Sequence, residues 1–348
     1  MLRYLLIPAS WIYGWVIHLR NYLFDAGLFK SEKFSTPIIC VGNVTVGGTG
    51  KTPMSELIID YMSRKGKRIA LLSRGYGRKS KGYIEVQTTS HYRQVGDEPL
   101  QIKLKFPETL VVVCEKRVDA IRRIEAEHPE IDLIVLDDGF QHRYVSPKVN
   151  IVMVDATRQP QEDSYLPYGT LRDELDQLHR AHYFVVTKCP DNMTPLERRL
   201  LRKYLVKVAY QKIYFTRMES FRPQPLFEDV APKEPLQRSQ RVIALSGIGN
   251  PMPFHKTLEK SYDVVERVTY DDHHVYKVRD VREIVALLEQ YPDAVVVTTE
   301  KDAVKLTNRE RIPERLQRAL YYLPINISFM EDSDTDLLNN LEKDVRRD

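Results

Sequence analysis

The chain has few cysteines: three among 348 residues. They stand far apart in the sequence, each in or beside an apolar, strand-like run, at Cys40, Cys114 and Cys189. No pair has the CxxC spacing of a metal site, and the three give no disulfide framework. We therefore expect small buried hydrophobic side chains at these positions and a reducing compartment for the protein.

The sequence also lacks a large charge imbalance and a long apolar run. Its formal net charge is +4 with 29% charged residues, so composition alone gives no indication of nucleic-acid binding. The N-terminal stretch, residues 1–28, is interrupted by Arg3, Arg20 and Asp25. It therefore has no uninterrupted span of about 20 apolar residues, which a transmembrane helix requires, and it has no small-residue cleavage signature of a signal peptide.

Residues 1–28 nevertheless contain both tryptophans of the chain. Apolar side chains recur there at helical spacing, at Ile12, Trp15, Val16, Leu19 and Leu23. A helix with this apolar side and basic residues nearby fits the interface of an anionic bilayer. The same spacing equally fits a helix packed on the protein's own core, so the residues leave both interpretations open.

The stretch VGNVTVGGTGKTP, residues 41–53, nearly spells a phosphate-binding loop. The usual pattern has a glycine five positions before Gly50, where this chain has Thr45. Backbone N–H groups at the glycines can still curl around phosphate oxygens, with Lys51 on the β- and γ-phosphates and the Thr52 hydroxyl on Mg²⁺. The residues predicted to bind nucleotide are Gly47, Gly48, Thr49, Gly50, Lys51 and Thr52. The GGxGKT spelling resembles the deviant loops of partitioning ATPases and some metal-insertion GTPases.

Apolar strand-like runs alternate with helical patterns along the rest of the chain. The length suggests two domains, and the alternation predicts an α/β fold. We expect a P-loop kinase-type, doubly wound, mostly parallel sheet with a second, smaller α/β domain, and ligands at the carboxyl ends of the strands. The first domain is placed at residues 29–220, a proline-rich linker at 221–240, the second domain at 241–335 and a polar tail at 336–348.

Three acidic or histidine motifs offer further chemistry. Asp137 and Asp138 follow an apolar strand in IVLDDGFQH, where a kinase needs a metal-holding acid, although helix capping is the alternative role. Asp97 in VGDEP can accept a proton from an attacking hydroxyl, or cap a helix. His273 and His274 in YDDHHVY are neighbours and point to opposite faces of an extended chain. At most one of them therefore reaches a given centre, and an ordinary surface loop is the other interpretation.

Eight motifs occur in a recognisable order: RNYLFDAGLFKS, VGNVTVGGTGKTP, SRGYGR, VGDEP, LDDGFQH, VVTK, DHH and TTEKDAVKL. Their order and spacing resemble the tetraacyldisaccharide 4′-kinase (lipid A 4′-kinase) family of Gram-negative bacteria. The resemblance implies transfer of the γ-phosphate of ATP, with Mg²⁺, to the 4′-hydroxyl of a tetraacylated glucosamine disaccharide 1-phosphate, which gives lipid IV-A. It also implies a peripheral or monotopic enzyme at the cytoplasmic face of the inner membrane, with residues 1–28 as the membrane-associating helix. We infer no nucleic acid and no obligate protein among its partners.

The resemblance further implies roles for individual residues. The catalytic residues would be Asp97 as the base, His273 as its partner from the second domain, Lys51 and Asp138. The metal residues would be Thr52, Asp137 and Asp138, and the substrate contacts Asn43, Arg74, Arg78, Arg117 and Arg172. The chain departs from the family at residues 166–174, which read LPYGTLRDE where many members have LPAGPLRE. Arg172 is retained, but the acid after it is Asp173, and its role is left open.

A competing interpretation is a nucleotide switch of the partitioning-ATPase or metal-insertion GTPase class, which shares the GGxGKT loop. VVTK, residues 185–188, faintly resembles a guanine-reading motif but lacks the Asn and Asp that make it specific. Such a switch gives no reason for a tryptophan-rich start combined with a second domain that bears histidines. A purely structural membrane adaptor would leave the glycine loop and the acids unexplained.

Overall fold

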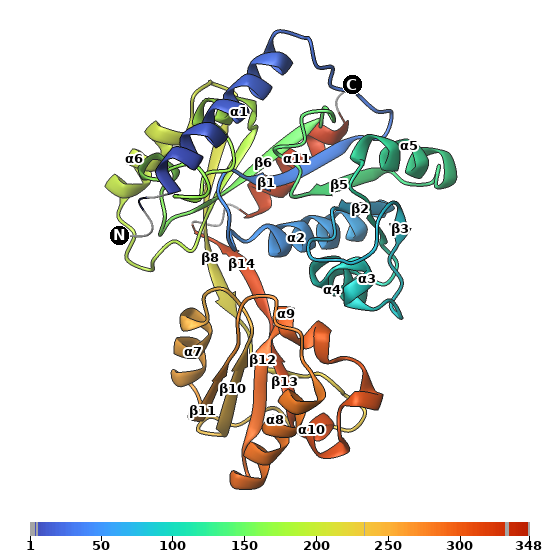
Figure 1. Ribbon diagram of the computed structural model, residues 1–348, viewed down its shortest axis with the longest axis vertical. Helices are drawn as coiled ribbons and strands as arrows, with labels where there is room; N and C mark the ends of the chain where they lie inside the picture. Colours follow the sequence, from blue (N-terminus) through green and yellow to red (C-terminus); the bar gives the residue numbers. More distant parts are fainter. Residues whose placement is uncertain (1–3, 5, 233, 331–333, 347–348) are drawn as a thin grey trace.

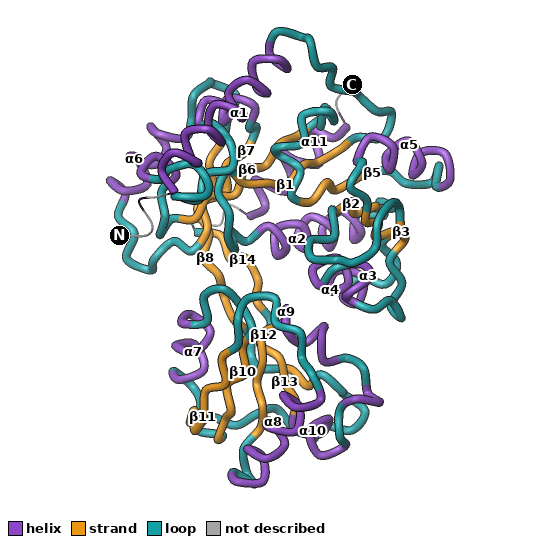
Figure 2. Tube along the Cα trace, in the orientation of Figure 1, coloured by secondary structure: helices purple, strands orange, loops and turns teal. Residues whose placement is uncertain are grey.

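The computed structural model describes residue 4 and residues 6–232, 234–330 and 334–346. Within these ranges the chain forms two α/β lobes, one above the other along the longest axis of the molecule (Figure 1). A pair of strands runs from the larger lobe toward the smaller one, as the trace coloured by secondary structure also shows (Figure 2). The predicted α/β class with a smaller second unit is confirmed.

The large lobe is built on a nine-stranded sheet. Seven strands are parallel: β1 (Ile38–Asn43), β2 (Ile69–Ser73), β4 (Leu110–Val113), β5 (Leu133–Asp137), β6 (Val149–Asp155), β7 (Tyr183–Thr187) and β8 (Lys212–Ser220). The antiparallel edge strands are β3 (Ile84–Glu85) and β14 (Ile325–Phe329). The order is β14-β8-β7-β6-β1-β5-β2-β4-β3, which places β1 at the centre. The central strands are buried and almost entirely apolar, as strands covered on both faces should be.

Helices cover both faces of this sheet. One face carries α2 (Lys51–Arg64), α3 (Tyr92–Val95), α4 (Asp97–Lys105) and α11 (Asp334–Arg346), and the other carries α5 (Arg117–Glu127) and α6 (Pro195–Leu205). Two short 3-10 helices, η2 (Pro160–Glu162) and η3 (Leu175–Arg180), lie between β6 and β7 in the sequence. The side chains of β1 alternate between the layers: Ile39 and Val41 face the first, and Ile38 and Cys40 the second. All three cysteines are free and buried, as expected.

The small lobe has a five-stranded sheet in the order β11-β10-β12-β13-β9. Its parallel strands are β10 (Arg241–Ser246), β11 (Asp263–Thr269), β12 (Val295–Thr299) and β13 (Leu320–Leu323), and β9 (Gln224–Pro225) is antiparallel to β13. The helical segments are α7 (Met252–Glu259), α8 (Val278–Gln290), α9 (Glu300–Ala303), η4 (Val304–Leu306), η5 (Arg309–Arg311) and α10 (Glu314–Ala319). This lobe brings the histidine motif, in the loop between β11 and α8, toward the large lobe.

The structure corrects three of the expected boundaries. The predicted linker, residues 221–240, contributes β9 to the small sheet and Phe227 to its core. The end of the predicted second domain, β14, pairs with β8 in the large sheet. The predicted polar tail, residues 336–348, forms most of α11, which buries Leu337, Leu338 and Leu341 against the large lobe, while residues 347 and 348 lie outside the described ranges. These three leucines stand among asparagines and charged residues, so the apolar side of the helix is narrow and the segment reads as polar in sequence.

The predicted N-terminal helix is present as α1 (Ile7–Asp25). Its buried residues are Ser10, Gly14, Ile17, Asn21 and Phe24, which form a narrow, partly polar side against the large lobe. A Cβ on Gly14 would come within 2.7 Å of the ring of Tyr165, so the helix needs glycine for this close approach. The opposite, apolar side is exposed. No helix in the described part of the chain combines the length and the apolar character needed to cross a membrane.

Candidate active site

The glycine loop connects the end of β1 to the start of α2. Gly50, just before α2, has φ 86°, and Gly47 has φ 111°, so both lie in the left-handed region that favours glycine. Two hydrogen bonds brace the loop: Asn43 Nδ2 donates to Thr49 Oγ1 at 2.9 Å, and Thr187 Oγ1 donates to the Thr49 carbonyl at 3.0 Å. The shaped backbone and the N-terminus of α2 together provide an anion site.

The crest of the loop is open on one side and faces a cation on the other. A Cβ on Gly48 would have no heavy atom of the described chain within 4 Å. Arg158, in the loop after β6, donates from Nη2 to the Val46 carbonyl at 2.7 Å and lies over Gly47. Lys51 and Thr52 are partly buried in the first turn of α2. The predicted loop residues therefore line one surface that favours negative charge.

Asp138 stands just past the carboxyl end of β5, beside β1. Lys51 Nζ lies 3.6 Å from Asp138 Oδ1, and Arg172 donates to the two oxygens of the same carboxylate at 2.9 and 3.0 Å. Arg172 also donates to Asn43 Oδ1 at 3.3 Å. Burial would raise the pKa of Asp138, but Lys51 and Arg172 outweigh it and lower that pKa below its usual value. The predicted residues thus form one connected group with an ionised carboxylate.

Asp137, the last residue of β5, is more deeply buried. Burial, with the charges of Glu98 and Asp138, raises the pKa of Asp137 to about 7, against the opposing effect of Lys51 and a hydrogen bond from Ser73. Ser73 Oγ donates to Asp137 Oδ2 at 3.1 Å, whereas Oδ1 is buried without a hydrogen-bond partner in the described chain. An orphaned carboxylate oxygen next to an ionised neighbour is a fitting place for a hard divalent cation.

Asp97 is the first residue of α4. The preceding Gly96 has φ 93°, and a Cβ there would come within 3.1 Å of the backbone of Gly75, so glycine is needed for the turn. Asp97 Oδ1 accepts a hydrogen bond from the backbone N–H of Glu98 at 3.0 Å. The capping and the catalytic interpretations of Asp97 are therefore compatible, because its second oxygen, Oδ2, remains available for another partner.

That partner comes from the small lobe. His273 Nδ1 lies 3.0 Å from Asp97 Oδ2, although the two residues are 176 positions apart. His274 turns away: its Nε2 lies 3.0 Å from Asp280 Oδ2, and its ring stacks on Tyr270 with a centroid distance of 4.1 Å. The contact across the lobes therefore distinguishes the two histidines: His273 lies against Asp97, and His274 does not.

Burial would raise the pKa of Asp97, but the hydrogen bond from His273 and the nearby charges of Lys301 and Lys305 lower it below the usual value. Lys301 Nζ lies 3.2 Å from His273 Nε2 and 3.4 Å from Glu98 Oε1. The sequence analysis assigned no role to Glu98 or to these lysines. Glu98 belongs to the VGDEP motif and the two lysines to TTEKDAVKL, so their presence in these motifs could have identified them as candidate site residues.

The remaining predicted arginines have different positions. Arg74 is exposed, and Arg117 is buried at the start of α5, where Asp137 and Asp138 lie near enough to oppose the lowering of its pKa by burial and by Arg74. Arg78 points into the large lobe: its Nη2 donates to Glu115 at 2.6 Å and to the Gly82 carbonyl at 2.8 Å, and its side chain is 3% exposed. The guanidinium of Arg78 holds the turn after β2, so this structure gives no support to the expected substrate contact.

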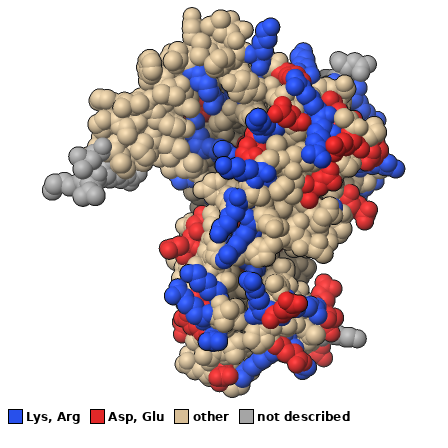
Figure 3. Space-filling view, turned by 45° about the vertical axis from the view of Figure 1, so that its right-hand side comes forward, with Lys and Arg blue, Asp and Glu red and all other residues tan. Residues whose placement is uncertain are grey.

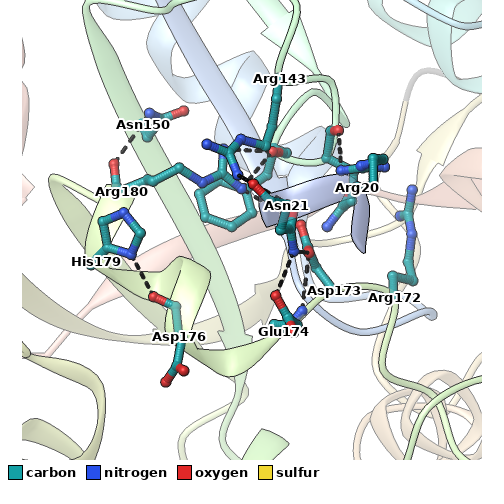
Figure 4. Close-up of polar contacts among 12 residues, drawn as sticks. Arg20, Asn21, Arg143, Asn150, Arg172, Asp173, Glu174, Asp176, His179 and Arg180 are labelled. Atoms are coloured by element: carbon teal, nitrogen blue, oxygen red, sulfur yellow. Dashed lines mark hydrogen bonds and ion pairs between the residues drawn. The ribbon is translucent and has the colours of Figure 1, made fainter. Parts of the chain in front are cut away.

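Asp173 anchors α1. Figure 4 shows Asn21 of α1 above Asp173 and Glu174, while Arg172 points away from them. Asn21 Nδ2 donates to Asp173 at 2.9 Å and to Glu174 at 2.8 Å, and Arg180 lies 3.5 Å from the other oxygen of Asp173. The acid that departs from the family pattern thus fixes the N-terminal helix to the loop that carries Arg172.

Comparison with known proteins gives a consistent result over the whole chain. A protein-family model described as tetraacyldisaccharide-1-P 4′-kinase matches residues 2–344. The chain is 39% identical to the tetraacyldisaccharide 4′-kinase of Phocaeicola vulgatus over 98% of this chain and 95% of that relative, and 34% identical to that of Flavobacterium johnsoniae over 99% of each. A crystal structure of LpxK from Aquifex aeolicus in complex with ATP matches with a TM-score of 0.73 and 28% identity, covering 99% of this chain and 100% of that one.

Proposed function

The chain belongs to the tetraacyldisaccharide-1-P 4′-kinase family, and from this premise we propose how its residues divide the work of the reaction. The enzyme transfers the γ-phosphate of ATP to the 4′-hydroxyl of the acylated disaccharide 1-phosphate in lipid A biosynthesis. This activity replaces the nucleotide-switch alternative. The residue roles, the metal and the membrane surface are the proposal.

The glycine loop and Lys51 hold the triphosphate and neutralise charge that develops during transfer. Phosphoryl transfer needs positioning and charge stabilisation more than covalent help, because its transition state is loose. The left-handed Gly47 and Gly50, the N-terminus of α2 and Lys51 converge on one surface, which supports this role. Arg172 and Asn43, which are hydrogen-bonded to each other beside Asp138, would contact the sugar or its phosphate. Arg74 and Arg117 would do the same.

Thr52, Asp137 and Asp138 would hold Mg²⁺. The unpartnered, buried Oδ1 of Asp137 and the ionised Asp138 provide oxygen ligands of the kind that Mg²⁺ prefers. A bound Mg²⁺ supplies charge neutralisation at the phosphate oxygens. The protein residues contribute the oxygen ligands.

Asp137→Asn and Asp138→Asn are expected either to abolish transfer or to raise the Mg²⁺ concentration for half-maximal rate by about tenfold or more, since each removes an anionic ligand. Steady-state rates across a Mg²⁺ titration at saturating ATP measure this. Asp132→Asn, which changes an exposed carboxylate outside the site, is the matched control. Titration curves equal to that of the parent protein in both variants would refute the metal role.

Asp97 takes the proton of the attacking hydroxyl. The observation that carries this proposal is the 3.0 Å contact between Asp97 and His273 beside the phosphate site, because it completes the site with one residue from each lobe. As the new O–P bond forms and the bond to the β-phosphate oxygen breaks, the hydroxyl proton passes to Asp97 and the bonding electrons leave with ADP. Contact between the lobes would exclude water and so protect ATP from hydrolysis.

Radiolabel transfer tests the proposed function. Purified full-length protein is incubated with [γ-³²P]ATP, Mg²⁺ and the tetraacyldisaccharide 1-phosphate in detergent, and the product is located by ³¹P NMR. We expect one new phosphomonoester at the 4′ position for each ATP consumed. Label released only as inorganic phosphate, or placed on the 1-phosphate, would contradict the proposal.

The exposed side of α1 would lie in the interface of the cytoplasmic face of the inner membrane, where the acylated substrate resides. Trp11 and Trp15 are 74% and 65% exposed, and the same side presents Ile12, Val16, Leu19 and Tyr22. Figure 3 shows a broad area without charged residues on the left of the large lobe. Exposed indole rings and aliphatic side chains on one helix side favour an interfacial position. The side of the helix with Ser10, Gly14 and Ile17 packs on the large lobe, whereas the side with the tryptophans would face the membrane. Packing on the protein and membrane contact therefore concern different sides of α1.

Replacing Trp11 and Trp15 together with serine is expected to shift the enzyme from vesicles toward the aqueous fraction by about tenfold or more, because burial of indole surface supplies part of the interfacial affinity. Sedimentation with anionic phospholipid vesicles measures the shift, and the KM for lipid presented in vesicles should rise with it. Val278→Ser, which changes a 60% exposed side chain of the small lobe, is the control. Equal partitioning of the double variant and the parent, with equal thermal stability, would refute the membrane role.

A further inference from the structure

Lys301, in α9 of the small lobe, contacts the imidazole of His273 on the side opposite Asp97. Its Nζ lies 3.2 Å from His273 Nε2, while His273 Nδ1 lies 3.0 Å from Asp97 Oδ2. We propose that Lys301 is a positioning residue that keeps His273 neutral with its single proton on Nδ1, directed at Asp97. The inference rests on the proposed role of Asp97 as the base.

The donors and acceptors at this contact allow one arrangement. A lysine ammonium has three N–H donors and no lone pair, so the imidazole nitrogen beside it must be the acceptor. Nε2 of His273 therefore carries the lone pair, and the proton lies on Nδ1. Nδ1–H then donates to Asp97 Oδ2, a hydrogen bond that the other tautomer could not make.

The charge of Lys301 also opposes a second proton on His273. An imidazolium would place its Nε2–H against an ammonium at 3.2 Å, with like charges facing each other and no acceptor between them. Burial alone would lower the pKa of Lys301, but Glu98, Asp97 and Asp272 together raise it above its usual value, so the ammonium persists at neutral pH.

The other groups around His273 would favour the imidazolium. Asp97 faces one nitrogen, Asp272 Oδ2 lies 3.9 Å from the other, and the Tyr76 ring lies beside the imidazole with a centroid distance of 5.2 Å. Lys305 is the second lysine nearby, but it pairs with Asp302 at 2.9 Å and lies 3.9 Å from Asp97. Lys301 is therefore the cation whose position determines the protonation state of His273.

The protonation state of His273 affects the basicity of Asp97. A neutral imidazole orients the Asp97 carboxylate through one hydrogen bond and leaves a full negative charge to take the hydroxyl proton. An imidazolium would neutralise part of that charge and make Asp97 a weaker base, since basicity governs the rate of proton transfer. After transfer the proton remains on Asp97, and His273 keeps the proton it already held.

Side-chain ¹⁵N NMR of histidine-labelled, nucleotide-free enzyme at about pH 7 tests this directly, because neutral tautomers and the imidazolium give different nitrogen shifts. The chain has nine histidines, and His273 is assigned by the signal lost in His273→Gln. We expect the neutral Nδ1–H pattern in the parent protein and in Lys301→Arg, and an imidazolium pattern in Lys301→Met. An imidazolium in the parent, or a neutral His273 in Lys301→Met, would overturn the proposal.

Glu98→Gln is the matched control, because it removes the other partner of Lys301 without removing the ammonium. It should keep the neutral pattern, and an imidazolium in this variant would assign the effect to Glu98 instead. All variants are compared by thermal unfolding, so that loss of the fold is recognised. The spectrum requires no substrate, so its result does not depend on the transfer reaction. The proposed role of Asp97 as the base is tested separately, and normal transfer by Asp97→Ala would contradict it.

The pH dependence of kcat gives a second readout. Lys301→Met should lose about tenfold in kcat at pH 7 and recover toward the parent value as the pH is raised, because a higher pH removes an imidazolium. Lys301→Arg should follow the parent profile, and the KM for ATP should change little in either variant. A loss in Lys301→Met that is equal at all pH values would indicate a merely structural role and overturn the proposal.

Discussion

Lys51→Ala is expected to lower kcat by roughly a thousandfold, the scale found when a charge-stabilising group is removed from a transition state. The ammonium lies at the start of α2, and among the charged groups of the described residues its one ion pair is with the Asp138 carboxylate, at 3.6 Å. We therefore expect Lys51 to act on bound nucleotide and to contribute little to the packing of the core. Thr52→Ala should also lower kcat by orders of magnitude, through the lost hydroxyl. Steady-state transfer rates at saturating ATP and lipid measure both effects.

The fold should survive these changes. In Lys51→Ala the Asp138 carboxylate keeps Arg172 at 2.9 Å, so no buried charge is left alone. Lys65→Ala is the matched control, because Lys65 stands at the other end of α2 and makes a partly exposed ion pair with Glu342 at 3.7 Å. It should transfer phosphate at nearly the parent rate. Near-normal turnover in Lys51→Ala, with the melting temperature unchanged, would mean that the phosphate site lies elsewhere.

Asp97→Ala and His273→Ala should each lower kcat by about a hundredfold to ten-thousandfold, the usual contribution of a general base. ATP affinity should change little, because within the described part of the chain neither Asp97 nor His273 makes a hydrogen bond or ion pair with the glycine loop. Calorimetry measures that affinity. The lipid KM should also change much less than kcat, because Asp97 accepts the proton in the transition state and adds little to the binding of the lipid before the reaction.

His274→Gln separates this role from simple damage to the histidine loop. His274 contacts Asp280 and stacks on Tyr270, so its replacement should lower thermal stability while kcat stays within a few-fold of the parent value. A loss in His274→Gln as large as that in His273→Ala would show that the loop conformation matters and the choice between the two histidines does not.

The sequence was most informative where chemistry and local structure coincide. The glycine loop could be predicted because Gly47 and Gly50 adopt the left-handed backbone that the loop requires, and Lys51 begins the helix after it. Asp137 and Asp138 could be predicted because an apolar strand that ends in acids places them at the ligand-binding edge of a parallel sheet. In both motifs the relevant neighbours lie close in the sequence or follow from the sheet order.

Contacts between distant segments could not be predicted in this way. Lys301 contacts His273 and Glu98, which belong to different motifs and different lobes, and no local pattern links the three. Arg78 had the same apparent character as Arg74, but only the fold shows that Glu115 takes its guanidinium. The charge of an arginine can be read from a sequence, whereas the direction of its side chain depends on the packing around it.

The structure of the chain ends and of the segments between the lobes could not be predicted, for a related reason. Helix α11 has few apolar residues, and their burial depends on side chains more than 200 positions earlier, such as Met62, which belong to the same core cluster. Strand β14 joins the large sheet because β8 extends out of it and offers a free edge. Helix α1 was predicted as a helix, but which of its sides contacts the protein depends on the polar anchor at Asp173 and on the close approach at Gly14.

The central claim is that Asp97 and His273 act as one unit across the two lobes, and a double-mutant cycle on kcat tests it most directly. The single variants Asp97→Ala and His273→Ala and the double variant are compared with the parent protein at saturating ATP and lipid. We predict that the double variant is about as slow as the slower single variant, because the first substitution already removes most of the contribution of the pair to kcat. A double variant whose loss equals the product of the two single losses would contradict the account.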